Sequence, residues 1–462
     1  MTARVERGWL GPGMVSVSLG MVAVILGWML LAPELNRPAV AGYDIDRMVL
    51  LYSTLPRMVT ALICGGALAL SGALFQQVLR NPLASPTTLG ISAGANLALV
   101  LVTLFIPGLL GLGRDVVALA GSAAAAGIVL SLGARRGFSP FSLILSGLVV
   151  SLWCGALAAI LTLLNDRYLV SLFIWGAGSL AQQSWAVPLS LLAKVGVIAA
   201  SCGLLVRPLA MLELGDGGAS ALGVRIVHLR ILAIAAAVAL SAFVTSAVGV
   251  IGFIGLVAPT ICRLAGARRP GALLLWSSLV GALLLLLADE AVQLLSGTVA
   301  EFLPTGAVTA IFGSPLLLVL LPLLKVRHRI LPVEGPVVRR MVAQRWRVAP
   351  VVAAAVVAIG IGLFVGRPPD GGWAWLAPEL MEALLPFRAP KVFAALASGA
   401  MLAVAGVILQ RLTGNEMASP EVLGVSAGAT LGVTVALFAL SATPLASQLG
   451  FAAAGALLVL TI

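Results

Sequence analysis

The sequence contains little charge. Only 10% of its 462 residues are Asp, Glu, Lys or Arg, whereas 61% are hydrophobic. A soluble domain carries about 25% charged residues, so this composition excludes a soluble multi-domain protein. Apolar runs of about 20 residues, the length that crosses a bilayer core as a helix, recur along the chain. We therefore expect an all-α integral membrane protein, a polytopic helical bundle.

Residues that act as metal ligands or nucleophiles are also scarce. The chain has two histidines, His228 and His328, and four cysteines without a CxxC spacing. The cysteines lie within or at the ends of apolar runs, at positions 64, 154, 202 and 262, which indicates packing roles. No metal-ligand cluster results, and no GxxxxGKS/T loop is present to bind ATP phosphates. We expect no enzymatic activity, no cofactor and no metal site made of this chain's side chains.

One stretch of the sequence occurs twice. Residues 81–97 read NPLASPTTLGISAGANL and residues 415–431 read NEMASPEVLGVSAGATL, with 11 of 17 positions identical at an offset of 334. A repeat of this length in so apolar a chain predicts two fused membrane-spanning units. We expect a first membrane-spanning unit over residues 1–330, a basic cytoplasmic connector over 331–347 and a partial second unit over 348–462.

The apolar runs predict ten helices in the first unit and about four in the second. The expected spans are 14–33, 57–79, 88–107, 115–134, 141–164, 186–206, 229–250, 252–265, 271–295 and 306–325, then 348–365, 391–412, 422–441 and 448 to the end. Residues 14–33 resemble a signal peptide, but the run is long for one and ends in no clear cleavage site. We interpret it as the first membrane helix.

The distribution of Lys and Arg predicts the orientation. With the N-terminus in the cytoplasm, 18 basic residues of the first unit and the connector fall on the inner side and five on the outer side. An even number of spans then gives both units the same direction, as a parallel repeat requires. The net charge of +11 is thereby explained as an orientation signal, and we expect no nucleic-acid partner.

Two segments on the predicted inner side depart from simple spans. Residues 80–94, RNPLASPTTLGISAG, contain Pro82 and Pro86, which prevent a continuous helix. Such backbone is tolerated at a membrane where it is buried in protein or lines a path, so the segment is either a gate element or a tight turn. Residues 207–228 are too polar to span and long for a loop. They predict one or two short cytoplasmic helices, either a docking site or an ordinary connection.

Three ionisable residues fall within or at the ends of spans, where such groups are functional candidates. Asp289 and Glu290 end an apolar run, and we expect them near the outer interface in a solvated or capping role. Lys194 lies inside another run, where it either pairs with an acid or faces the interface.

Several of these motifs resemble one protein family. The run PRMVTALICGGALALSGALFQQVLRNPLASPTTLGISAGA, followed by GFIGLVAP, LLLLADE and EFLPTGAVTAIFGSP, is similar to the FecCD family of type II ABC importer permeases. These proteins move iron–siderophore chelates, haem and cobalamin. The resemblance covers residues 1–330 and restarts near 348, as in the double-length members that carry ferric hydroxamates.

The resemblance implies roles for particular residues. The translocation gate would contain Asn81 and Leu83, with Asn415 and Met417 in the second copy. The ATPase coupling loop would lie within 212–224 and include Glu213, Gly215, Asp216, Ala219, Leu222 and Gly223. Docking of the binding protein would use Arg57, and Arg388 and Lys391 in the second copy. Thr54, Thr260 and Gln293 depart from the family pattern, and the second copy reaches Ile462 before a coupling loop of its own.

These observations predict a permease subunit in the inner (plasma) membrane that imports iron(III)-hydroxamate siderophores with ATP hydrolysed elsewhere. The implied partners are a cytoplasmic ATP-binding-cassette ATPase dimer, a periplasmic or lipid-anchored siderophore-binding protein, the ferric siderophore and membrane lipid. Alternatives are an importer of another metal chelate (a catecholate siderophore, haem or cobalamin), an ion-coupled secondary transporter, and a truncated product that inserts without transporting.

Overall fold

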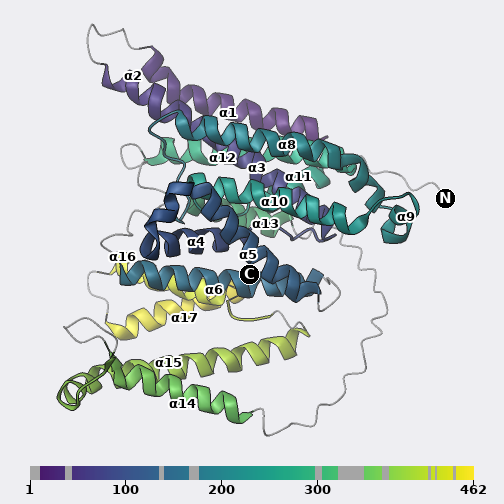
Figure 1. Ribbon diagram of the computed structural model, residues 1–462. Helices are drawn as coiled ribbons and strands as arrows, with labels where there is room; N and C mark the ends of the chain where they lie inside the picture. The colour runs from purple at the N-terminus through teal and green to yellow at the C-terminus, as the bar shows by residue number, and fades with distance from the viewer. Residues whose placement is uncertain are drawn as a thin grey trace. The chain divides into compact units, whose positions relative to one another are not determined.

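A computed structural model describes residues 11–36, 44–134, 140–165, 176–296, 304–320, 348–366, 374–414, 418–421, 424–440 and 444–461. The chain forms two compact units, Met1–Arg327 and His328–Ile462, which we describe separately. The described residues of both units lie almost wholly in helices, as the apolar composition predicts (Figure 1).

The helices of the first unit follow the expected spans closely. They are α1 (Pro12–Leu35), α2 (Ile45–Val49), η1 (Leu50–Thr54), α3 (Leu55–Val78), α4 (Ile91–Phe105), η2 (Pro107–Leu112), α5 (Arg114–Ala134), α6 (Pro140–Leu164), α8 (Ala186–Leu212), α9 (Gly215–Ala221), α10 (Ile226–Val248), α11 (Ile254–Leu264), α12 (Pro270–Ser296) and α13 (Thr305–Leu320). Among the described residues of the whole chain, eight helices are long and apolar enough to cross a membrane.

Helix α11 is shorter than a full span. Its 11 residues rise about 16 Å, roughly half of a bilayer's hydrocarbon thickness. The helix expected to cross over 252–265 is therefore shorter than a full span, and α4, with 15 residues, is short as well. The total of ten spans in this unit stays a prediction.

Helix α3 lies at the centre of the first unit, against α8, α10, α11 and α12. Glycines permit this close packing. A Cβ atom at Gly65 would overlap the carbonyl oxygen of Gly281 on α12, and one at Gly72 would overlap that of Gly255 on α11. Membrane helices associate through such small residues because lipid supplies no hydrophobic force between them.

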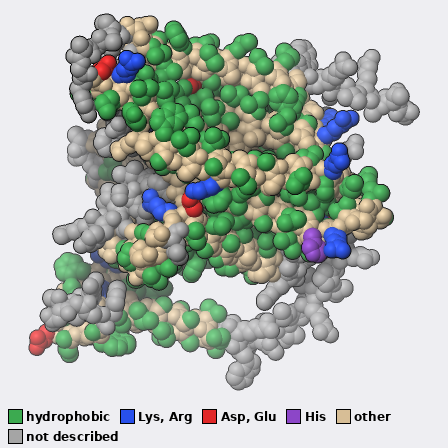
Figure 2. Space-filling view, turned by 45° about the horizontal axis from the view of Figure 1, so that its top comes forward, with side chains coloured by type: hydrophobic (Ala, Val, Ile, Leu, Met, Phe, Trp, Pro, Cys, Tyr) green, Lys and Arg blue, Asp and Glu red, His purple; other side chains and the backbone are tan. Residues whose placement is uncertain are grey.

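The outer helices present large apolar side chains outward. Trp28 on α1, Leu163 on α6 and Leu204 on α8 are 60%, 79% and 80% exposed. Figure 2 shows a face made mostly of hydrophobic side chains and backbone, interrupted by few charged groups. A surface of this kind suits a lipid environment, since a soluble protein rarely exposes so large an apolar area.

The second unit contains α14 (Val348–Phe364), strands β1 (Val365–Gly366) and β2 (Ala374–Trp375), α15 (Pro378–Thr413), α16 (Val425–Ala439) and α17 (Leu445–Thr461). The two strands pair antiparallel. Helix α15 begins at Pro378 and includes Pro386 and Pro390, whereas we expected the span to begin at residue 391. The prolines remove single hydrogen bonds without ending the helix.

The repeat is visible in helix packing. In the first unit α4 and α5 meet where Gly94 faces the carbonyl oxygen of Gly121. In the second unit α16 and α17 meet where Gly428 faces the carbonyl oxygen of Gly455, at the same offset of 334 in the sequence. The duplicated residues therefore make the same helix pair in each unit.

Candidate gate and coupling site

The segment that follows α3, which we call the Asn–Pro turn (residues 80–90), begins with a helix-ending motif. The backbone N–H of Asn81 donates to the carbonyl oxygen of Gln76 at 3.1 Å, and that of Arg80 donates to Gln77 at 3.4 Å. In this motif the residue at the position of Arg80 takes a left-handed conformation and is usually glycine. Arg80 has φ of 50°. A residue with a Cβ atom pays roughly 1–2 kcal/mol for that conformation.

The second copy has glycine at this position. Gly414, the counterpart of Arg80 at the repeat offset, has φ of 62°. Both copies of the helix therefore end in the left-handed region, but only the first places a side chain there.

Asn81 and Leu83 have different environments within the turn. The Asn81 side chain is buried, and its Oδ1 accepts a hydrogen bond from the Leu83 backbone N–H at 3.0 Å. Leu83 is 37% exposed. Asn81 thus holds the backbone in a tight turn, and Leu83 presents an apolar side chain from it. Their counterparts Asn415 and Met417 lie outside the described residues.

The rest of the turn is closed by its own residues. The backbone N–H of Ser85 donates to Thr88 Oγ1 at 2.9 Å, and the N–H of Thr88 donates to Ser85 Oγ at 3.2 Å. Gly90 precedes α4 with φ of 73°, and the N–H of Ile91 donates to the carbonyl oxygen of Pro86 at 3.0 Å.

The same geometry recurs in the second unit. Gly424 also has φ of 73°, and the N–H of Val425 donates to the carbonyl oxygen of Pro420 at 2.9 Å. Because the two copies differ in their surroundings, this conformation is determined by the local Pro and Gly pattern.

The segment between α8 and α10, which we call the α9 segment (residues 212–224), contains one short helix, as expected. It lies at the opposite end of the first unit from α2 (Figure 1). Ala219 is fully buried and anchors the helix, while Leu214 and Leu222 are 67% and 58% exposed. Glu213 and Asp216 are exposed, and Gly215 and Gly223 have positive φ at either end.

Arg80 joins the Asn–Pro turn to the α9 segment. Its Nη2 donates to the Leu212 carbonyl oxygen at 2.8 Å and to Asp216 Oδ1 at 2.9 Å. Asp216 also accepts from Arg230 Nη2 on α10, at 3.0 Å to Oδ2. The two segments that the sequence predicted separately are therefore in direct contact. Arg80 was not among the predicted site residues, although a charged residue opposite a glycine in the repeat is a signal of an added role.

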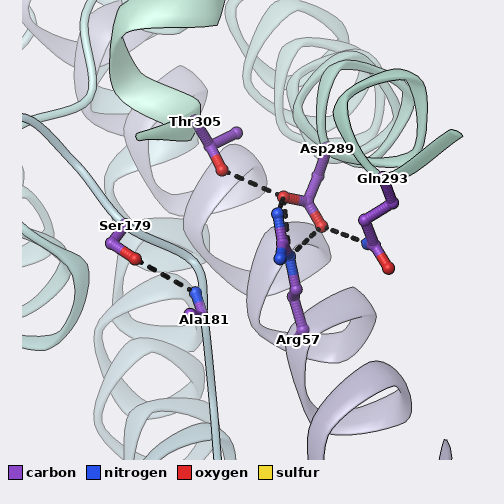
Figure 3. Close-up of polar contacts among 6 residues, drawn as sticks. All are labelled: Arg57, Ser179, Ala181, Asp289, Gln293 and Thr305. Carbon is purple, nitrogen blue, oxygen red and sulfur yellow. Dashed lines mark hydrogen bonds and ion pairs between the residues drawn. The ribbon is translucent and has the colours of Figure 1, made fainter. Parts of the chain in front are cut away.

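A second polar cluster surrounds Asp289 (Figure 3). Arg57 Nη2 donates to Asp289 Oδ1 at 2.8 Å, and Arg57 Nε donates to Oδ2 at 2.9 Å. Thr305 Oγ1 donates to Oδ1 at 3.0 Å and Gln293 Nε2 donates to Oδ2 at 2.8 Å. The carboxylate is thus satisfied by groups from α3, α12 and α13.

This cluster corrects two predictions. Arg57, expected to meet a binding protein, is only 6% exposed and its guanidinium is held by Asp289, so it is not presented at a surface. Asp289 and Glu290, expected in a solvated or capping role, are fully buried. Both Glu290 oxygens are without a hydrogen-bond partner among the described residues. The hydrophobic periodicity of the sequence places these charged residues near the end of a span, but it does not show that other helices bury them.

The remaining candidate residues are dispersed. In the second unit Arg388 Nη1 donates to the carbonyl oxygen of Val365 at 2.7 Å, and Lys391 is exposed. Lys194 pairs with Asp115, which settles its two alternatives in favour of pairing. All four cysteines are free and buried, which confirms their packing role.

Comparison with known proteins identifies the family. Residues 14–322 and 351–462 match the model of the FecCD transport family, which is most of the chain. The chain belongs to the FecCD transport family. The resemblance seen in the motifs is confirmed, and it extends over both units.

Known FecCD proteins and a solved structure are similar to this chain. It is 42% identical over 450 residues to the iron(3+)-hydroxamate import system permease protein FhuB of Escherichia coli, covering 94% of this chain and 66% of that protein. It is 35% identical over 308 residues to the Fe(3+) dicitrate transport system permease protein FecD of the same species, covering 66% of this chain and 92% of that protein. A protein described as a metal-chelate type ABC transporter, solved in an inward-facing conformation, matches with TM-score 0.57 and 28% identity over 67% of this chain and 99% of its own.

The chain spans about two thirds of the length of the FhuB relatives that it matches, 66% for E. coli and 63% for Salmonella typhimurium. FecCD membership together with the apolar helices makes the chain a multi-pass protein of the inner membrane. The named relatives are permease proteins of import and transport systems.

Proposed function

We propose that this chain is the membrane-spanning permease subunit of an ATP-driven importer of iron(III)-hydroxamate siderophores. The observation that carries this proposal is the 42% identity to a hydroxamate permease along 94% of the chain, through both units. The siderophore encloses the iron, so the permease needs a path for a large chelate and no metal ligands of its own.

Transport in this proposal occurs by alternating access, in which the path opens to one side of the membrane at a time. The Asn–Pro turn of each unit closes the inner end. Leu83 supplies an apolar contact, Asn81 holds its backbone, and Met417 and Asn415 take the same parts in the second unit. The partly exposed Leu83 side chain supports this role, because a gate residue must present its side chain outside its own turn.

The α9 segment receives the ATPase. Leu214 and Leu222 are exposed at the two ends of a short helix whose Ala219 is buried against the rest of the unit. The two leucines can therefore make apolar contacts with a partner while the helix stays in place. Glu213 and Asp216 add negative charge, and Gly215 and Gly223 let the chain turn at both ends. A separate ATPase dimer that binds here transmits its closure to the membrane helices.

A siderophore-binding protein delivers the chelate from the other side. Since Arg57 is buried, docking in the first unit uses other groups. In the second unit the exposed Lys391 is the stronger candidate, because Arg388 already donates to Val365. A positive group at this position attracts acidic residues of the partner.

The identity of the transported chelate is a more specific part of the proposal than the importer itself. The similarity to a Fe(3+) dicitrate permease makes an iron chelate other than a hydroxamate the second candidate substrate. An ion-coupled carrier is the rival mechanism, and it differs in requiring no ATP.

Uptake by proteoliposomes tests these alternatives together. The chain is reconstituted with its ATPase and binding protein, and uptake of radiolabelled iron is measured as a ferric hydroxamate, as ferric citrate, as a catecholate complex and as haem. We expect ATP-dependent uptake of the hydroxamate. Uptake of another chelate alone would replace the substrate, and uptake driven by an ion gradient without ATP would contradict the importer itself.

A further inference from the structure

Arg80 occupies a position at which the fold favours glycine. Its φ of 50° lies in the left-handed region, and the second copy of the same turn has Gly414 there with φ of 62°. Backbone strain of this kind persists where the side chain has a role that outweighs it. The second copy shows that this kind of helix end forms without a side chain, because Gly414 occupies the position of Arg80 there.

The Arg80 side chain contacts three helix ends at once. It begins at the C-terminus of α3, donates to the last residue of α8 through the Leu212 carbonyl oxygen, and pairs with Asp216 in the first turn of α9. A guanidinium beside the C-terminus of α8 is also favourable because that end of a helix carries partial negative charge. No other residue in the described part of the first unit links the Asn–Pro turn to Asp216 by a hydrogen bond.

The strength of this link suits a contact that is made and broken. Arg80 and Asp216 are both 48% exposed, so the ion pair is partly solvated and contributes little to the stability of the fold. Arg230 Nη2 donates to both oxygens of Asp216, at 3.1 Å to Oδ1 and 3.0 Å to Oδ2, and so can keep the carboxylate in place when Arg80 releases it.

We propose that Arg80 is a positioning residue that transmits displacement of the α9 segment to the Asn–Pro turn, and so couples ATPase engagement to the gate. This inference rests on the proposed function, because it assigns the α9 segment to the ATPase and the turn to the gate. It goes further in naming the residue between them.

The test uses Arg80→Gly, which installs the residue that the second copy carries. This variant removes the side chain and relieves the left-handed strain, so it is expected to unfold at the same temperature as the parent or higher. Arg268→Ala, which removes an exposed basic side chain between α11 and α12, is the matched control. In reconstituted proteoliposomes we expect ATPase association to persist and chelate uptake per ATP hydrolysed to fall about tenfold in Arg80→Gly, with no change in the control.

Amide hydrogen exchange provides a readout that needs neither ATPase nor cargo. Asp216→Ala is expected to accelerate exchange at residues 81–90 in the parent and to add nothing in the Arg80→Gly background. If Asp216→Ala leaves exchange in the turn unchanged, or acts equally in both backgrounds, the link through Arg80 is overturned. Unchanged uptake per ATP in Arg80→Gly would also overturn it. Failure of the parent protein to import any chelate would reject the proposed function and leave the exchange result to decide the link.

Discussion

Arg57 and Asp289, which are 232 positions apart in the sequence, form a bidentate ion pair inside the first unit. The pair joins the first turn of α3 to the last part of α12, and Thr305 adds the start of α13. Two charges removed from solvent are tolerated here because every Asp289 oxygen accepts at least two hydrogen bonds. Burial of one without the other is unfavourable.

Removing either partner should therefore destabilise the protein strongly. We expect Arg57→Ala or Asp289→Ala to lower the free energy of unfolding by about 3–5 kcal/mol, because each leaves an uncompensated buried charge. Arg47→Ala, at an exposed site on α2, should change it little. Unfolding of the purified protein in detergent measures the effect. The double variant Arg57→Met/Asp289→Leu should be more stable than either single alanine variant, and a further additive loss would contradict the pairing.

Close approach of α3 and α11 gives a second prediction. A methyl group at Gly72 would overlap the Gly255 carbonyl oxygen, so Gly72→Ala should cost about 1–3 kcal/mol through displacement of the helices. At Gly203 on α8, no atom lies within 4 Å of the position that a methyl group would take, and Gly203→Ala should be neutral or slightly stabilising. The melting temperatures of the two variants are compared with that of the parent. A loss in Gly72→Ala alone attributes the destabilisation to the close helix contact, whereas an equal loss in both attributes it to replacing a glycine.

The duplicated turn predicts equal behaviour of two glycines. Gly90 and Gly424 both have φ of 73°, a conformation in which alanine is disfavoured by roughly 1–2 kcal/mol. We expect Gly90→Ala and Gly424→Ala each to lose at least this much stability in an unfolding assay. Gly127→Ala in the middle of α5, where the space is open, serves as the control. A cost at Gly90 with none at Gly424 would show that the turn depends on its surroundings.

The exposed leucines of the α9 segment provide a test of ATPase docking. Burial of a leucine side chain is worth about 1.5–3 kcal/mol, so Leu214→Ser or Leu222→Ser should weaken association with the ATPase by about tenfold or more. Ser220→Ala, on the same helix, should leave association unchanged, since its hydroxyl donates only to Gly217 within the helix. Co-purification and titration of the ATPase in detergent measure the effect. Full affinity in both leucine variants would exclude the segment as the docking site.

Local patterns predicted much of this fold. The apolar runs predicted most helix ends to within a few residues, with α8 and α15 as exceptions, and Pro82 and Pro86 predicted the break after α3. The α9 helix was predicted from its polarity. These features depend on neighbours in the sequence, which is why one sequence is enough to find them.

Features that depend on distant residues were missed. Nothing in the periodicity of 57–79 shows that Arg57 meets Asp289, and nothing near Arg80 shows that it meets Asp216 at a separation of 136 positions. Helix α8 also continues to Leu212 through Pro208, because Leu209 and Leu212 are buried against the core and offset the hydrogen bond that the proline removes. Tertiary packing therefore decides the helix ends and the partners of the charged residues.

The hydrogen bonds inside the Asn–Pro turn join residues at most five positions apart. Contacts of such short range form early, because little chain entropy is lost in making them. During synthesis the first turn can therefore take its shape while α10, α11 and α12 are still untranslated, and the second can do so without help from the first. Helices made later can then pack against a bend that has already formed.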